Sequence, residues 1–245
     1  MILRILNKAN FTQKFLHPIS RINDLCTLTI QENSIYNLNR TVDSSLSLYS
    51  VCEDIEVLDY TEKTNISFAD IKKFIKAFDC ISDATVDLII NANSVEYKSN
   101  GTKFKFHLIN DNIVKSPNYN IEKINSLQFD NEFMMNISIY NLLIKSSTFI
   151  TNSNKIYIGT DGGNVIAELT DKSKSNVDSY STKISEVYSG SSIEKPLSFN
   201  FDLFRNVSFL KTTDILIRIN NKGFIAFDVV DDKYKLKYTA TAYSV

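Results

Sequence analysis

The sequence predicts an α+β protein made of two similar halves, and three features support this class. Apolar residues alternate with lysine and threonine from Lys233 to Ala242, a period-two pattern typical of an antiparallel strand that is buried on one side only. A weaker copy of this strand runs from Lys103 to Leu108. The segments before the two copies also match each other. The sequence therefore predicts a repeated unit of sheet and helix with one solvated sheet face.

The repeat is clearest just before the two alternating strands. Residues 66–75 predict a short strand followed by an amphipathic helix, and residues 197–207 predict the same pair. Three strands joined by short polar turns follow in each case, and the last of them is the alternating strand. Each region is therefore expected to form one strand-helix-strand-strand-strand unit.

The front part of each half predicts a second unit of the same kind. Met1 to Leu6 predicts a strand, and Phe11 to His17 predicts a short helix that Pro18 is expected to end. The other expected elements are a helix over 139–148 and strands near 27–31, 34–39, 45–51, 133–136, 155–159, 164–170 and 180–187. The chain is thus expected to contain four helices.

The four expected helices each combine an apolar face with a polar face that carries a cation. The apolar residues are Phe11, Phe15, Leu16 and Ile19; Ile71, Phe74, Ile75 and Phe78; Leu142, Leu143 and Ile144; and Leu203, Phe204, Val207 and Leu210. The cations are Lys14, Lys72, Lys73, Lys76, Lys145, Arg205 and Lys211. Ser67 and Asp70 form an expected capping pair at the start of the second helix. Exposed cations ordinarily serve only to keep a protein soluble. Their recurrence on every helix also suggests that positive charge is concentrated on the helices rather than spread evenly over the surface.

Composition limits the classes of function. The 245-residue chain has 27 Lys and Arg against 28 Asp and Glu, so its overall charge gives no indication of nucleic-acid binding. No apolar run approaches the ~20 residues that span a bilayer, and the N-terminus lacks a signal-peptide pattern, so we expect no membrane association. Three cysteines at no metal-like spacing predict free thiols in a reducing cytoplasm, which is the host cytoplasm if the protein is viral.

A polar segment separates the two halves. Residues 110–127 contain Ser116-Pro117-Asn118, and this composition is typical of a connector. We therefore expect a first domain over residues 1–109, an interdomain connector over 110–127 and a second domain over 128–245.

Support for catalysis or for a metal site is weak. His17 and His107 are the only histidines, and no Ser-His-Asp or Cys-His spacing accompanies them. Asp228, Asp231 and Asp232 are candidate cation ligands, although solvation of the hairpin before the last strand explains them better. We therefore expect no enzyme activity, no cofactor and no metal site.

The glycines between Gly159 and Gly163 allow two interpretations. A phosphate-binding loop is one, but no Lys-Ser/Thr pair and no helix follow these residues. Asp161-Gly162-Gly163 is also a hairpin turn signal, and we favour the hairpin.

The order of elements resembles that of the DNA sliding clamps, the proliferating cell nuclear antigen (PCNA) family. It resembles most closely the tailed-phage type of DNA polymerase processivity factor. The resemblance covers essentially the whole chain and is most specific from Lys155 to Ala242. There, Ser179 to Ile184, Leu197 to Asp202 with the helix after it, and the closing three strands follow the family's order and spacing.

The resemblance implies a two-domain DNA-clamp fold in which helices line the inner face of antiparallel sheets. It implies a homotrimer that closes head to tail into a ring around duplex DNA. Edge strands of neighbouring subunits are expected to pair, and Lys103 to Leu108 and Tyr180 to Ile184 are the candidates. The implied partners are double-stranded DNA, bound through its backbone without sequence preference, a DNA polymerase and a clamp loader.

The resemblance also assigns roles to individual residues. Contacts to phosphate carry no sequence information, so a few flexible cations would let the ring slide. The implied DNA-facing residues are Lys14, Lys72, Lys73, Lys76, Lys145, Arg205 and Lys211. The implied partner-binding residues are Ile113, Val114, Tyr119, Ile121 and Tyr243, which are placed to contact short peptide tails of a polymerase. Anchoring of the connector to the sheet explains these apolar residues equally well.

Two other classes of protein remain open at this point. A structural β-rich virion or tail component would share the one-sided strands, but it would need neither four cation-bearing helices nor an internal repeat. A single-strand binder would need exposed aromatic residues interleaved with cations. Most aromatic residues here lie in phase with the buried faces instead.

Overall fold

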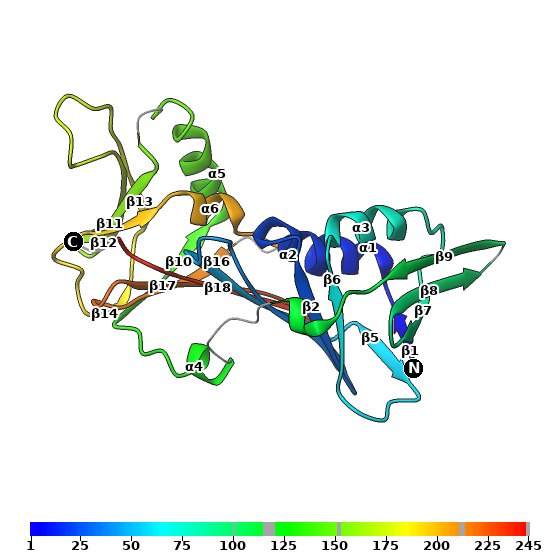
Figure 1. Cartoon of the computed structure of the whole chain (residues 1–245). Coiled ribbons are helices and arrows are strands. Elements are labelled where there is room, and N and C mark those ends of the chain that lie inside the picture. Colours follow the sequence, from blue (N-terminus) through cyan, green and yellow to red (C-terminus); the bar gives the residue numbers. More distant parts are fainter. Residues whose placement is uncertain (100, 115–120, 151–152, 211–213, 244–245) are drawn as a thin grey trace. The chain divides into compact units, whose positions relative to one another are not determined.

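The structure is a computed structural model that describes residues 1–99, 101–114, 121–150, 153–210 and 214–243, without the side chains of residues 121 and 123. The chain divides into two compact units, and each is described by itself. Unit 1 comprises Met1–Ile121 and Val230–Leu236, and unit 2 comprises Glu122–Val229 and Lys237–Val245. Figure 1 labels the elements along the chain. Within the described ranges, no helix is both long and apolar enough to cross a membrane.

Unit 1 contains two sets of antiparallel strands. A five-stranded sheet has the order β5-β1-β7-β8-β9, and a second set has the order β4-β3-β2-β6. The strands are β1 (Ile2–Ile5), β2 (Cys26–Gln31), β3 (Ser34–Arg40), β4 (Leu46–Cys52), β5 (Ile55–Leu58), β6 (Thr64–Phe68), β7 (Val86–Asn91), β8 (Ser94–Ser99) and β9 (Thr102–His107).

The helices of unit 1 lie together on one side of its strands (Figure 1). The first helical segment is continuous through α1 (Lys8–Phe11), the π-helix η1 (Thr12–Leu16) and α2 (His17–Ile22), and the second is α3 (Ile71–Asp79). The rings of Phe11 and Phe78 pack with their centroids 6.0 Å apart. All eight apolar residues predicted for these two helices are buried.

Pro18 does not end the first helix as expected. The preceding turn is a π-helix, in which the His17 N–H donates to the Thr12 carbonyl, and Pro18 occupies the first turn of α2. Proline lacks an N–H and its ring crowds the carbonyl four residues earlier. A first-turn position needs no such N–H, and the wider π-turn leaves more room than an α-turn, so the helix continues to Ile22.

Unit 2 repeats this organisation. A four-stranded sheet has the order β13-β12-β11-β15, and a second set has the order β14-β10-β16-β17-β18. The strands are β10 (Asn131–Asn136), β11 (Lys155–Asp161), β12 (Asn164–Leu169), β13 (Tyr180–Ser185), β14 (Ser189–Gly190), β15 (Leu197–Asn200), β16 (Asp214–Ile219), β17 (Phe224–Asp231) and β18 (Tyr234–Thr241). Its helices are α4 (Ile121–Asn125), α5 (Ile137–Ser146) and α6 (Asp202–Asn206).

The strand pairings confirm the predicted internal repeat. In unit 1, β1 pairs with β5 and β7, and β2 pairs with β3 and β6. In unit 2, β10 pairs with β14 and β16, and β11 pairs with β12 and β15. The short strands β5 and β14, which were not expected, therefore occupy equivalent places in the two units.

The α+β class is confirmed, and so is the one-sided burial of the last strand. Tyr234, Leu236, Tyr238 and Ala240 are buried on β18, while Lys235 and Thr241 are exposed. The glycine-containing turn after β11 is the hairpin that we favoured, because Asp161 pairs with Asn164 across it. Gly162 and Gly163 both have positive φ there, which glycine adopts without strain.

Two details of the helices in unit 2 differ from prediction. On α5, Tyr140, Leu143 and Ser146 are buried, whereas Leu142 is 43% exposed. Three consecutive residues cannot share one helix face, because each advances by about 100°. On α6, the helix ends at Asn206, and Val207 already has extended backbone angles.

Part of the expected connector is helical. The 3₁₀ helix η2 (Asp111–Ile113) and α4 lie within residues 110–127. Residues 115–120, which include Ser116-Pro117-Asn118, lie outside the described residues. The domain limits of 1–109 and 128–245 remain a prediction.

The three cysteines are free, as predicted. Cys26 and Cys52 are buried, and loss of hydration raises the pKa of both thiols, that of Cys52 to about 12. Both side chains are therefore neutral at physiological pH. Cys80 is exposed at the end of α3.

Candidate nucleic-acid interface

The exposed face of α3 presents three lysines in unit 1. Asp70 caps the helix by accepting a 2.9 Å hydrogen bond from the Lys73 N–H. The four buried residues of α3 point into the core, which leaves Lys72, Lys73 and Lys76 exposed. The predicted cap is correct for Asp70 but wrong for Ser67, which is buried on β6 and donates to Asp111 instead.

One of these lysines has an acidic partner. The Nζ atom of Lys72 lies 3.1 Å from each carboxylate oxygen of Asp24. Within the described part of the chain, neither Lys73 nor Lys76 forms an ion pair with another residue. Because Asp24 comes 48 residues before Lys72, no local sequence signal connects them.

Lys14 was predicted to be exposed, and this is wrong. Its side chain is only 12% exposed and forms an ion pair with Asp231. Its Nζ atom also lies 5.3 Å from the centre of the Tyr234 ring. Lys14 lies in η1. The turn between β17 and β18 covers it with the Asp231 carboxylate and the face of the Tyr234 ring. Such a cation contributes to folding and is not available to a ligand.

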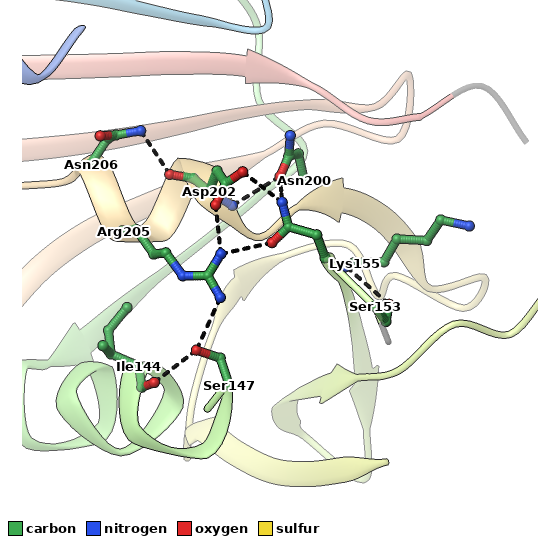
Figure 2. A network of polar contacts seen from close by, with 9 residues as sticks. Ile144, Ser147, Ser153, Lys155, Asn200, Asp202, Arg205 and Asn206 are labelled. Atoms are coloured by element: carbon green, nitrogen blue, oxygen red, sulfur yellow. Dashed lines mark hydrogen bonds and ion pairs between the residues drawn. The ribbon is translucent and has the colours of Figure 1, made fainter. Parts of the chain in front are cut away.

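Arg205 and Lys145 behave differently in unit 2. Arg205 on α6 donates to Asp202 and to the Ser147 hydroxyl at 3.2 Å (Figure 2). It also donates to the Asn154 side chain at 2.8 Å. Its guanidinium group also stacks on Phe201 at 4.8 Å. Lys145 on α5 is exposed and has no ion pair among the described residues.

Lys211, the last of the implied DNA-facing residues, lies outside the described residues. Among the implied DNA-facing residues that the structure describes, those without an ion pair are therefore Lys73 and Lys76 on α3 and Lys145 on α5. The acidic partners Asp24 and Asp231 were not predicted, because only the fold brings them to these lysines.

The implied partner-binding residues are only partly described. Ile113 in η2 is 60% exposed, and Val114 after it is partly buried. Tyr243 is 45% exposed, and its backbone N–H donates to the Ser198 carbonyl at 2.8 Å. Tyr119 and the side chain of Ile121 lie outside the described residues.

Both strands nominated for subunit pairing lie at the end of a sheet. β9 ends the five-stranded sheet of unit 1, and β13 ends the four-stranded sheet of unit 2. Beside β13, the ring of Phe149 is 51% exposed and meets Tyr180 edge to face at 6.3 Å. A strand with one unpaired edge and an exposed aromatic beside it is a typical site of protein association.

The acidic residues of the C-terminal hairpin have partners of their own. Arg218 donates to Asp228 with its Nε atom at 2.9 Å, and Asp231 pairs with Lys14. Across the ranges that the structure describes, no group of three or more metal-ligating side chains is found. These contacts give Asp228 and Asp231 basic partners within the protein.

Solved structures of other proteins share this architecture. Neither family models nor curated protein sequences give a match. Among solved structures, PCNA of A. fulgidus, determined with the C-terminal region of FEN-1, has a TM-score of 0.80 at 15% identity, covering 100% of this chain and 99% of that one. PCNA of Thermococcus kodakaraensis has a TM-score of 0.78 at 13% identity, covering 99% and 100%.

A third example is PCNA of Entamoeba histolytica, with a TM-score of 0.74 at 13% identity, covering 99% of this chain and 98% of that one. The similarity in each case extends over both units. The chain therefore has the PCNA sliding-clamp fold along its whole length.

Proposed function

We propose that the protein is a sliding clamp that encircles duplex DNA as a homotrimeric ring and tethers a DNA polymerase for processive synthesis. The full-length similarity to PCNA structures carries this proposal. We propose that it acts as a scaffold, without enzyme activity, and is loaded onto DNA by a clamp loader. The order of elements from Lys155 to Ala242 supports a clamp of the tailed-phage type, acting in the host cytoplasm.

The charge distribution suits weak, non-specific contact with DNA. Each phosphate that a lysine neutralises contributes affinity, and the logarithm of the binding constant falls by about 0.9 per tenfold increase in salt for each contact. Lys73, Lys76 and Lys145 offer only a few such contacts per chain. Closure of the ring would then provide persistence on DNA, and weak contacts would allow sliding.

The edges of the sheets support closure of the ring. β9 and β13 each present one edge that has no strand partner among the described residues. Pairing of β9 in one subunit with β13 in the next would remove both edges. Because the two strands differ, such a head-to-tail contact generates a ring when its rotation closes.

Partner binding is proposed on the exposed apolar residues Ile113 and Tyr243, each in its own unit. The PCNA of A. fulgidus was determined with the C-terminal region of FEN-1 bound, so that clamp binds the C-terminal region of another protein. We propose the same mode here for a polymerase tail.

The decisive experiment measures the length of DNA made by a cognate polymerase with and without this protein and its loader. Replacement of Lys72, Lys73 and Lys76 together by Ala should shorten the products while the assembly keeps its mass in solution. Replacement of Lys63, Lys195 and Lys222 by Ala removes the same charge from exposed sites elsewhere and should leave the product length unchanged. Equal product lengths for all three proteins would contradict the assignment of α3 to DNA.

The alternative, a structural β-rich virion or tail protein, predicts a different outcome. Such a protein would neither extend synthesis nor form a closed trimer. The similarity to PCNA over the full length favours the clamp.

A further inference from the structure

Half of the described cations that the resemblance implies to face DNA form ion pairs with aspartate side chains of the protein itself. Lys14 pairs with Asp231, Lys72 with Asp24, and Arg205 with Asp202. The other three, Lys73, Lys76 and Lys145, have no ion pair among the described residues. A protein that used every helix cation to hold DNA would not neutralise half of them with its own acids.

The three pairs are not equivalent. The Lys14 side chain is 12% exposed and is covered by Tyr234, so it cannot reach a phosphate without local unfolding. Arg205 has three hydrogen-bond acceptors in addition to its contact with Phe201. Lys72, in contrast, is 58% exposed, and Asp24 provides its only described side-chain contact. Lys72 is therefore the cation that can leave the Asp24 carboxylate and pair with a DNA phosphate instead.

The backbone fixes Asp24 beside α3. The Asp24 carbonyl accepts a 3.0 Å hydrogen bond from the Ile71 N–H, the first residue of the helix. The carboxylate thereby stays at the start of α3 with both oxygens 3.1 Å from Lys72 Nζ. This geometry keeps the partner close to the lysine and leaves 42% of the Asp24 side chain exposed on the same surface.

We propose that Asp24 is a built-in competitor of DNA phosphate that weakens the contact between α3 and DNA. This inference rests on the proposed function. To contact a phosphate, Lys72 must leave Asp24, and the phosphate must approach a fixed negative charge. Lys73 and Lys76 then supply the attraction, while the Lys72–Asp24 pair adds little net charge to the surface. A weaker contact lowers the barrier between successive positions of the ring on DNA.

The test uses the assembled protein and a fluorescein-labelled linear duplex of mixed sequence, onto which a ring can thread without a loader. Binding is measured by fluorescence anisotropy over a series of KCl concentrations. Asp24→Asn keeps the backbone contact to Ile71 and the size of the side chain, but it releases Lys72. We expect tighter binding, by up to about fivefold, the effect of one exposed ion pair, and a salt slope steeper by about 0.9 for each freed contact.

Two further variants isolate the role of Lys72. Lys72→Ala alone should leave the salt slope nearly unchanged, because the lysine makes no phosphate contact while it is paired. It should weaken binding, because the Asp24 carboxylate then stands without its partner on the surface that DNA approaches. In the double variant, Lys72→Ala should cancel the gain that Asp24→Asn produces. Glu32→Gln, which removes an exposed carboxylate in the β2–β3 turn, controls for net charge and should leave the slope unchanged.

The outcomes separate this inference from the proposed function. If Lys73→Ala and Lys76→Ala weaken binding but Asp24→Asn leaves the slope unchanged, the competitor role is wrong and the clamp stands. A gain that persists in the double variant, or that Glu32→Gln reproduces, also overturns the competitor role. If no lysine of α3 affects binding, the assignment of α3 to DNA fails as well. If the protein neither binds the duplex nor extends synthesis, the proposed function itself fails.

Discussion

Arg205 joins three parts of unit 2 through one guanidinium group. It donates to Asp202 in its own helix, to Asn154 before β11 and to Ser147 at the end of α5. The planar group satisfies several acceptors in fixed directions, which an ammonium group does less well. At this position the cation holds elements together and has little capacity left for DNA.

Arg205→Ala should therefore lower stability more than it lowers DNA affinity. We expect a loss of roughly 1 kcal/mol in the free energy of unfolding, because the group is partly exposed and its ion pair is screened by water. Urea denaturation measures this loss. Lys145→Ala, on an exposed lysine of α5, should leave the urea midpoint unchanged but weaken binding to duplex DNA. The reverse result would show that Arg205 serves the interface.

Asp171 is buried and shows how hydrogen bonds can make a carboxylate strongly acidic. Lys155 donates to it at 2.8 Å, and the Ser173 hydroxyl donates at 2.6 Å. The bond from Lys155 is the main cause that lowers the pKa of Asp171 far below its ordinary value. The folded state therefore favours the ionised carboxylate.

This shift predicts a pH dependence of stability. A lowered pKa in the folded state stabilises the protein fully above the unfolded value of about 3.9, and the contribution is lost as the pH falls below it. Asp171→Asn should thus lower the melting temperature at neutral pH. The difference from the original protein should shrink steadily below pH ~3.9. A difference that stays constant with pH would contradict this assignment.

At the scale of single elements, α3 depends on the residue that caps its start and on its buried face. Asp70 accepts the Lys73 N–H, and Phe74 and Phe78 stack with ring centroids 5.7 Å apart. The cap satisfies an N–H that has no partner within the helix. The aromatic face fixes which residues of the helix point outward.

Asp70→Ala should destabilise unit 1 by about 1 kcal/mol through loss of the cap. Asp70→Ser retains a capping oxygen and should recover most of this stability. Hydrogen exchange of the first-turn amides of α3 reports the effect locally. Equal protection in the two variants would show that the cap is unimportant.

At the scale of the whole molecule, β9 and β13 each have an edge without a strand partner among the described residues, and these edges are where we expect a neighbouring chain to bind. Neighbouring residues of a strand direct their N–H groups to opposite sides. One of Ser181 and Thr182 on β13 therefore directs its N–H towards the free edge. Proline is tolerated at such an outward position within a subunit, but it cannot donate to a neighbouring chain.

Proline placed separately at Ser181 and at Thr182 should give two different results. The outward substitution should leave the fold intact and lower the mass in solution from that of the proposed trimer to that of a monomer. The inward one should disturb the pairing of β12 with β13 and lower the melting temperature. Sedimentation with circular dichroism distinguishes them. If both folded variants remain trimeric, β13 is not the subunit edge.

The sequence alone determined the repeat, the α+β class and the buried faces of the helices in unit 1. These follow from local periodicity, and apolar positions at spacings of two or of three and four residues predict which side of an element is buried. For this reason the buried residues of α3 and the alternating face of β18 were predicted correctly. The same periodicity placed the lysines of α3 on its exposed side.

Only the tertiary structure decided which cations are free. The partners of Lys14 and Lys72, Asp231 and Asp24, lie far away in the chain, and a hydrophobic pattern carries no information about pairs of charges at such separations. The continuation of the first helix through Pro18 depended on a π-turn, which no periodicity signals. Burial follows from local pattern because it needs only one apolar side, whereas an ion pair needs two specific atoms that the complete fold brings together.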